Sequence, residues 1–140
     1  MPPIRLLHPC AALAAVLLLS GQVGAAPADP LLTCEVTYAG LTHTVKARPV
    51  SDPYSVPSVD IGGRFWFKAV VVGQGRQVQR IALYAYLEGQ DQPLLIQAAT
   101  YLPPFGPWPG GRSLTGEQHL YAGPLERELI YNCQWLEGAP

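Results

Sequence analysis

Apolar and polar residues alternate along most of this chain, and a period of two is typical of β-strands with one buried face. The run LLTCEVTY (31–38) shows the alternation, and the run LTHTVKA (41–47) repeats it after Ala39-Gly40, a turn of hairpin length. A two-residue turn places the alternating, mostly apolar residues of both runs on the same face of the hairpin. The pattern and the turn therefore predict the same register. The predicted pairs are Tyr38 with Leu41, Val36 with His43, and Cys34 with Val45.

Similar runs follow at short intervals, separated by glycine- and proline-rich turns. The further expected strands are 64–72, 78–88, 93–102, 113–121 and 126–136. The segment 48–60, with three prolines, is expected to be a loop because proline fixes φ and removes a backbone donor. About seven strands without a helical period predict an all-β domain, either an antiparallel β-sandwich or a small β-barrel.

The motif Leu129-x-Tyr131-x-Cys133 is similar to the tyrosine-before-cysteine pattern of immunoglobulin strand F. The resemblance implies an immunoglobulin-like architecture with the strand order left open. The chain departs from the pattern because its second cysteine falls in the expected final strand, and no family is assigned on this motif.

Residues 1–28 have the pattern of a signal peptide. Arg5 supplies the positive start, and the apolar run 10–19 is shorter than the roughly 20 residues of a membrane span. Small residues place the cleavage after Ala25 or Ala28, and a retained membrane anchor is the alternative. Residues 29–140, roughly 112 residues, are then expected to form a single β domain in the periplasm or outside the cell.

Two cysteines remain once the signal is removed, Cys34 and Cys133. An exported chain with two cysteines usually forms one disulfide, which here ties the first strand to the last. The alternative is a thiol pair for metal or redox chemistry. The long separation of the two cysteines favours the disulfide, because redox and metal pairs are commonly spaced C-x-x-C.

Charge narrows the range of partners. The chain carries nine Lys and Arg against ten Asp and Glu, and removal of Arg5 makes the balance more acidic. No basic patch is evident, so nucleic acid is not expected as a partner. No apolar run after the signal is long enough to span a membrane.

The most unusual stretch is PPFGPWPGG, 103–111, in which prolines and glycines surround Phe105 and Trp108. Tyr54 lies in the other proline-rich loop. Rigid aromatic residues offer contact area at low entropic cost, so these three residues are the predicted binding surface if both loops meet at one end of the domain. The alternative is that Phe105 and Trp108 fold back and plug the open end of the sandwich.

The outer face of the expected strands 64–72 and 78–88 is a second candidate. Trp66, Lys68, Tyr84 and Tyr86 share one face by the period of two, as does Arg80. An aromatic and basic sheet face can take an extended peptide or a glycan. The other interpretation, that this face is the buried inner face of the second sheet, is favoured because both faces of the run 64–72 are apolar.

Metal-binding or catalytic use is a weaker hypothesis, based on His43 and His119. His43 shares a predicted face with Cys34, and Glu117 lies two residues from His119, so that the two could form an acid–base pair. The favoured interpretation is that each histidine lies at a sheet margin or edge with an ordinary hydrogen bond. No nucleophile motif is evident, so no catalytic residue, cofactor or metal is expected.

The sequence therefore predicts an exported, non-catalytic binding or accessory module whose partner is a protein or a cell-envelope glycan. The alternatives are a small periplasmic enzyme inhibitor and a metal-binding or enzymatic protein that uses His43 or His119.

Overall fold

The computed structural model describes residues 29–106 and 113–137. The elements in chain order are β1 (Leu31–Tyr38), β2 (Leu41–Ala47), β3 (Pro49–Val50), the 3₁₀ helix η1 (Pro53–Ser55), β4 (Val59–Ile61), β5 (Phe65–Gln74), β6 (Gln77–Leu87), β7 (Leu94–Tyr101), β8 (Ser113–Ala122) and β9 (Arg127–Leu136). The predicted signal segment, its cleavage sites and Trp108 lie outside the described residues. Within the described ranges, no helix is long and apolar enough to cross a membrane.

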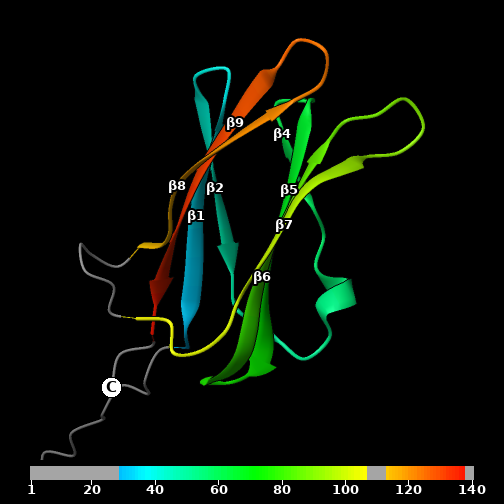
Figure 1. The fold of residues 1–140 in the computed structure, drawn as a ribbon. Coiled ribbons are helices and arrows are strands. Elements are labelled where there is room, and N and C mark those ends of the chain that lie inside the picture. The colour runs from blue at the N-terminus through cyan, green and yellow to red at the C-terminus, as the bar shows by residue number, and fades with distance from the viewer. Residues whose placement is uncertain (1–28, 107–112, 138–140) are drawn as a thin grey trace, which may run out of the picture.

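The strands form two sheets that face each other as layers (Figure 1). One sheet has the order β2-β1-β9-β8, and the other has the order β3-β5-β6-β7 with β4 also paired to β5. The predicted all-β fold is confirmed, but the described residues contain nine strands and not seven. The additional strands, β3 and β4, lie in the segment 48–60 that was expected to be a loop.

β3 and β4 escape a sequence pattern because they are only two and three residues long. They are held by backbone pairing with β5, β3 in parallel and β4 in antiparallel orientation. The five-stranded sheet is therefore mixed, whereas the four-stranded sheet is purely antiparallel. Pro49 is tolerated in β3 because this strand lies at a sheet edge, where a missing N–H need not break a ladder.

The first hairpin has the predicted register: Tyr38 pairs with Leu41, Val36 with His43, and Cys34 with Val45. Ala39 and Gly40 both have positive φ, 50° and 78°. Positive φ at both central residues is the backbone that a two-residue hairpin turn with right-handed strand twist requires. Ala39 adopts it despite its Cβ, because the two strands on either side fix the turn.

The two cysteines face each other across β1 and β9. Their Sγ atoms lie at disulfide distance, 2.03 Å, and their Cα atoms are 4.0 Å apart. The first long strand is thus tied to the last, as the sequence predicted. The pair lies within one sheet, whereas the immunoglobulin pattern joins two sheets, so the resemblance does not extend to the placement of the cysteines.

The main core fills the space between the layers. β5 contributes Phe65 and Phe67, and β9 contributes Leu129, Tyr131 and Trp135. A second, smaller cluster lies on the outer side of the five-stranded sheet. Its buried residues are Val70, Val72 and Ala82, and Val50, Val56 and Tyr84 pack against them.

Candidate functional site

Three aromatic side chains lie close together on the outer face of the five-stranded sheet. Trp66 of β5 is directly opposite Tyr86 of β6, and Lys68 is opposite Tyr84. The rings of Tyr84 and Tyr86 are stacked, with centroids 6.5 Å apart. Phe65 and Phe67, which alternate with Trp66 and Lys68, are in the inter-sheet core. The aromatic face is therefore an outer face, and the favoured interpretation of a buried inner face is wrong.

A hydrogen bond of its indole N–H fixes the orientation of the Trp66 ring. The indole N–H donates to the carboxylate of Glu88, which follows β6. The backbone N–H of Glu88 donates in turn to the carbonyl of Arg64 at 2.8 Å, which holds the end of β6 against the start of β5. Because the N–H is satisfied along the sheet, the indole ring needs no partner from a ligand and can offer its apolar surface.

A surface pocket of about 310 Å³ lies beside these rings. It is lined by Trp66 and Tyr86 together with Ser58, Gln92 and Pro93. Ser58 comes from the loop before β4, and Gln92 and Pro93 come from the β6–β7 loop. Two aromatic residues from adjacent strands thus form one wall, while a hydroxyl and an amide from two loops supply hydrogen-bonding groups.

The proline-rich loop 51–58 covers another part of the same outer face. Val56 packs on the small cluster around Val70, and η1 lies outside the five-stranded sheet (Figure 1). The Asp52 carboxylate accepts from the Tyr54 backbone N–H at 2.9 Å and begins the helical turn. Tyr54 is 92% exposed. The loop therefore covers the part of the face around Val70, lines the Trp66 pocket with Ser58, and presents Tyr54 to solvent.

The predicted surface of Tyr54, Phe105 and Trp108 is not brought together in the described residues. Phe105 is buried and packs against Trp135 in the inter-sheet core, with ring centroids 5.3 Å apart. Tyr54 lies on the outer side of the five-stranded sheet, away from this core. Phe105 has the plug arrangement that the sequence offered as the alternative, while the predicted role of Trp108 lies outside the described residues.

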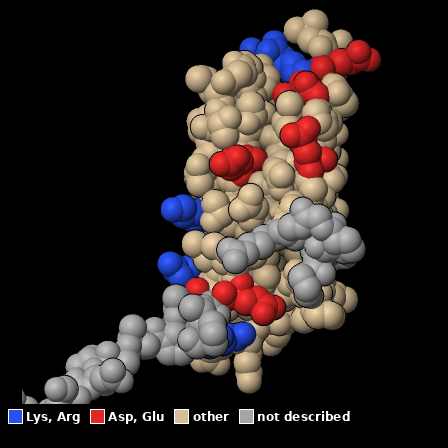
Figure 2. Space-filling view, turned by 90° about the vertical axis from the view of Figure 1, so that its left-hand side faces the viewer, with Lys and Arg blue, Asp and Glu red and all other residues tan. Residues whose placement is uncertain are grey.

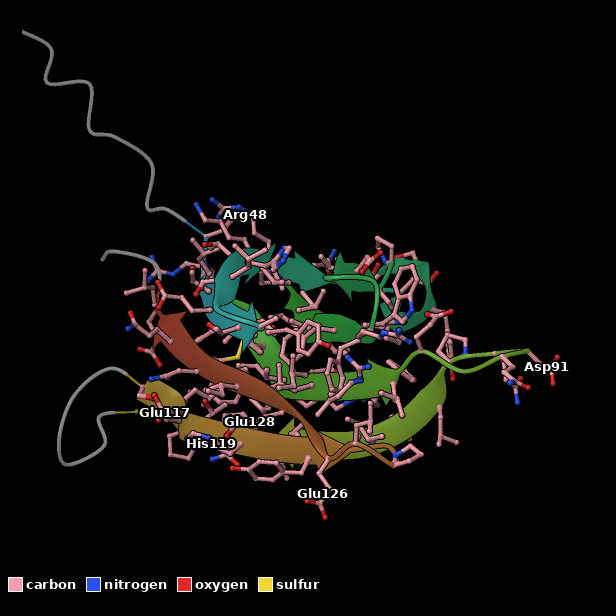
Figure 3. The ribbon with its side chains drawn as sticks, turned by 90° about the horizontal axis from the view of Figure 1, so that it is seen from above. Arg48, Asp91, Glu117, His119, Glu126 and Glu128 are labelled. Carbon is pink, nitrogen blue, oxygen red and sulfur yellow. A yellow bond between two sulfur atoms is a disulfide. The ribbon has the colours of Figure 1, made fainter. Side chains whose placement is uncertain are left out.

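His119 lies at the surface of edge strand β8 between two carboxylates (Figure 3). Its Nδ1 is 2.6 Å from Glu128, and its Nε2 is 3.0 Å from Glu117. The Tyr121 hydroxyl donates to the same Glu128 oxygen at 2.7 Å. The hydrogen bonds with Glu128 and then Glu117 raise the pKa of His119, and those from His119 and Tyr121 lower the pKa of Glu128.

This cluster is poorly suited to hold a metal ion. The two carboxylates engage opposite nitrogens of one imidazole, so the three groups do not converge on a common point. Among the residues that the structure describes, no three histidine, cysteine or acidic side chains are grouped to bind a metal. His43 is half-buried opposite Val36, and the sulfur atoms of Cys34 and Cys133 are joined to each other.

Figure 2 shows the side of the molecule that is on the left in Figure 1, which carries the four-stranded sheet. Acidic side chains lie along this side, and Lys and Arg side chains lie at its margins. The outer face of the five-stranded sheet differs, because aromatic rings and neutral polar groups line its pocket.

Sequence reasoning missed the groups that complete both surface clusters. Ser58 and Gln92 reach the Trp66 pocket from loops, where no period connects them to the strands, and the hydrogen bond from Trp66 to Glu88 joins neighbouring strands. Glu128 reaches His119 from the neighbouring strand, and only the register of β8 on β9 places it there. The signal that could have indicated the role of Glu88 was its place at the end of the expected strand 78–88, where the period of two puts it on the same face as Tyr84 and Tyr86.

No protein-family model, curated protein or solved structure matches this chain.

Proposed function

We propose that this protein is an exported, non-catalytic binding module that takes a cell-envelope glycan on the outer face of its five-stranded sheet. The observation that carries the proposal is the pocket in which Trp66 and Tyr86 stand side by side with Ser58 and Gln92. The signal-type segment 1–28 and the cysteine pair support a periplasmic or secreted location.

The chemistry of this pocket favours a sugar. Sugar rings expose C–H groups on their faces and hydroxyls around their edges. Aromatic rings offer an apolar surface for the faces, and hydroxyl and amide side chains can both donate to and accept from the edges. The indole N–H of Trp66 is already satisfied by Glu88, which leaves the ring surface for stacking and fixes its direction.

The row of rings extends beyond the pocket. Tyr84 stacks on Tyr86 and continues the aromatic surface along β6, with Lys68 beside it on β5. A surface that continues past one pocket suits a chain of sugars better than a single free monosaccharide. The preformed strands also reduce the conformational entropy that binding would cost.

The proposed binding site lies on the five-stranded sheet and not on the proline-rich loops that the sequence favoured, because the aromatic rings of those loops do not lie together. The ring of Phe105 is buried in the inter-sheet core, whereas Tyr54 is exposed outside the five-stranded sheet. Those two residues therefore do not form one contact surface. The histidine cluster supports catalysis less well, because both ring nitrogens of His119 are already hydrogen-bonded to carboxylates and neither is free to exchange a proton with a substrate.

A co-sedimentation assay with insoluble peptidoglycan and other purified envelope polysaccharides tests the proposal. The protein is expected to sediment with at least one of them, and Trp66→Ala and Tyr86→Ala are each expected to weaken binding about tenfold or more, as for a central contact residue. Tyr54→Ala is the matched control, because it removes an exposed aromatic ring elsewhere. Unchanged binding by both pocket variants would overturn the assignment.

A further inference from the structure

Strand β7 forms an exposed edge of the five-stranded sheet. Among the described residues it pairs with β6 on one side and with no strand on the other. An edge strand presents a row of unpaired backbone N–H and C=O groups, with which a further strand can pair. A bulge at Ile96 interrupts the pairing with β6 near the start of β7 and leaves Gln97–Tyr101 as a regular run. This run is the part of the edge that is best shaped to accept another strand.

The other sheet edges in the described part of the chain carry features that oppose such pairing. β3 and β4 are only two and three residues long, and Pro49 lies in β3. β8 has a bulge beside Gly116 and carries Glu117 and His119, and β2 carries the exposed Lys46. Short length, proline, bulges and charged side chains are the usual means by which edge strands avoid further pairing. β7 contains neither a proline nor a charged residue.

Exposed leucines lie at both ends of β7. Leu94 and Leu95 at its start are 62% and 51% exposed, and Leu102 directly after it is 68% exposed. Antiparallel pairing of two identical strands about a two-fold axis near Ala99 brings the start of one strand beside the end of the other. The leucines at the start of one β7 then meet Leu102 of a second copy. No like charges meet, because β7 is uncharged.

We propose that β7 pairs in antiparallel orientation with β7 of a second copy of this chain and so forms a dimer. The occupant is a second copy because the edge is complementary to itself, with apolar side chains at both ends and no charge between them. One strand edge is smaller than the roughly 800 Å² per partner of a standard interface, so we expect a reversible dimer with micromolar affinity.

The pairing also determines how the two copies are placed. The two-fold axis of two antiparallel strands is perpendicular to their sheet, so the five-stranded sheet continues into the second copy. The pockets beside Trp66 in the two copies then lie on the same side of the joined sheet. The dimer does not depend on what that pocket binds.

Sedimentation equilibrium of the purified protein tests the proposal, and a monomer–dimer equilibrium with a Kd of about 10–100 µM is expected. Leu95→Lys/Leu102→Lys should weaken association about tenfold or more, because it replaces apolar contacts with like charges. Leu41→Lys/Leu125→Lys is the matched control. It makes the same change at two leucines that are 67% and 73% exposed outside β7, and it should leave the Kd unchanged.

A charge reversal tests the antiparallel arrangement itself. Leu95→Glu/Leu102→Lys brings opposite charges together in the proposed dimer, so it should associate about tenfold more tightly than the double-lysine variant. Amide hydrogen exchange should also become slower within Gln97–Tyr101 as the protein concentration rises. The proposal is overturned if the parent protein stays monomeric up to about 300 µM. It is also overturned if the double-lysine variant dimerises like the parent, or if the amides that gain protection lie outside β7.

Discussion

Phe105 packs against Trp135 across the open end of the sandwich, with ring centroids 5.3 Å apart. Phe105 belongs to the proline-rich segment that leaves β7, and Trp135 belongs to the last strand. The contact therefore joins the chain after β7 to the four-stranded sheet. It explains why a stretch rich in proline and glycine contains a large buried ring.

Phe105→Ala should lower the free energy of unfolding by about 3 kcal/mol, because it removes a buried aromatic ring and leaves a cavity beside Trp135. Tyr54→Ala should change it by no more than about 0.5 kcal/mol, because Tyr54 is exposed. Urea unfolding of both variants measures the difference. A Phe105→Ala protein as stable as Tyr54→Ala would contradict the plug arrangement.

Loss of the cysteine pair should cost about 2–5 kcal/mol of stability. Cys34 and Cys133 are separated by 99 positions, so their bond closes a long loop and restricts the unfolded chain. The double variant Cys34→Ala/Cys133→Ala, compared with the oxidised protein in urea, gives the value. If reducing agent changes the stability of the parent protein but not that of the double variant, the effect comes from this bond.

The His119 cluster should make stability depend on pH near neutrality. The carboxylates of Glu128 and Glu117 raise the pKa of His119 above its ordinary 6.5, so the folded state holds this proton more tightly than the unfolded state. That contribution is fully present below the ordinary pKa and is lost as pH rises through the raised pKa. The lowered pKa of Glu128 adds stability above its ordinary 4.5, which is lost as pH falls through the lowered pKa.

His119→Gln should therefore flatten the decline in stability between about pH 6 and 8 that the parent protein shows. Thermal unfolding across this range measures the slope. His43→Gln is the matched control, since His43 is the other histidine of the described chain. Equal slopes for the parent and His119→Gln would show that the cluster does not couple proton binding to folding.

Tyr131 should produce a separate loss of stability in alkali. Burial, with a smaller Coulombic effect of Tyr101, raises its pKa from 10.0 to about 12, although its hydrogen bond to Gln97 opposes this. The unfolded chain releases the proton first, so stability falls as pH rises from about 10 to 12. Tyr131→Phe should reduce this fall and cost about 1 kcal/mol at neutral pH through the lost bond to Gln97.

Guanidinium unfolding at pH 7 and pH 11 measures both effects of Tyr131→Phe. Tyr54→Phe removes a hydroxyl from an exposed ring and serves as the control. If the free energy of unfolding falls by the same amount between pH 7 and pH 11 in both variants, Tyr131 is not the source of the alkaline loss.

The first hairpin was predictable because two independent constraints agree on it. The period of two fixes which side chains share a face, and the two-residue turn fixes which pairs meet, so Cys34 and Val45 could be paired correctly. β3 and β4 could not be predicted. They are too short to show a period, and they form because the backbone of β5 offers free hydrogen-bonding groups beside them.

The candidate site was only partly predictable, because the period within a strand fixes which residues share a face but not how strands and sheets are arranged around it. The shared face of Trp66, Tyr84 and Tyr86 follows from alternation within each strand, but whether that face is outer or inner depends on how the sheets stack. The partner of His119 depends on a bulge in β8, where Gly116 has a φ of 67°. The resulting register places Tyr121 opposite Glu128, and so places Glu128 diagonal to His119.

The most direct test of the account is a nuclear magnetic resonance titration with soluble glycan strands prepared from envelope peptidoglycan. The account predicts that the Trp66 indole signal and the ring signals of Tyr86 shift saturably, whereas the Trp135 indole signal stays in place. Binding that leaves Trp66 and Tyr86 unchanged, or no binding by this or any other envelope polysaccharide, would contradict the account.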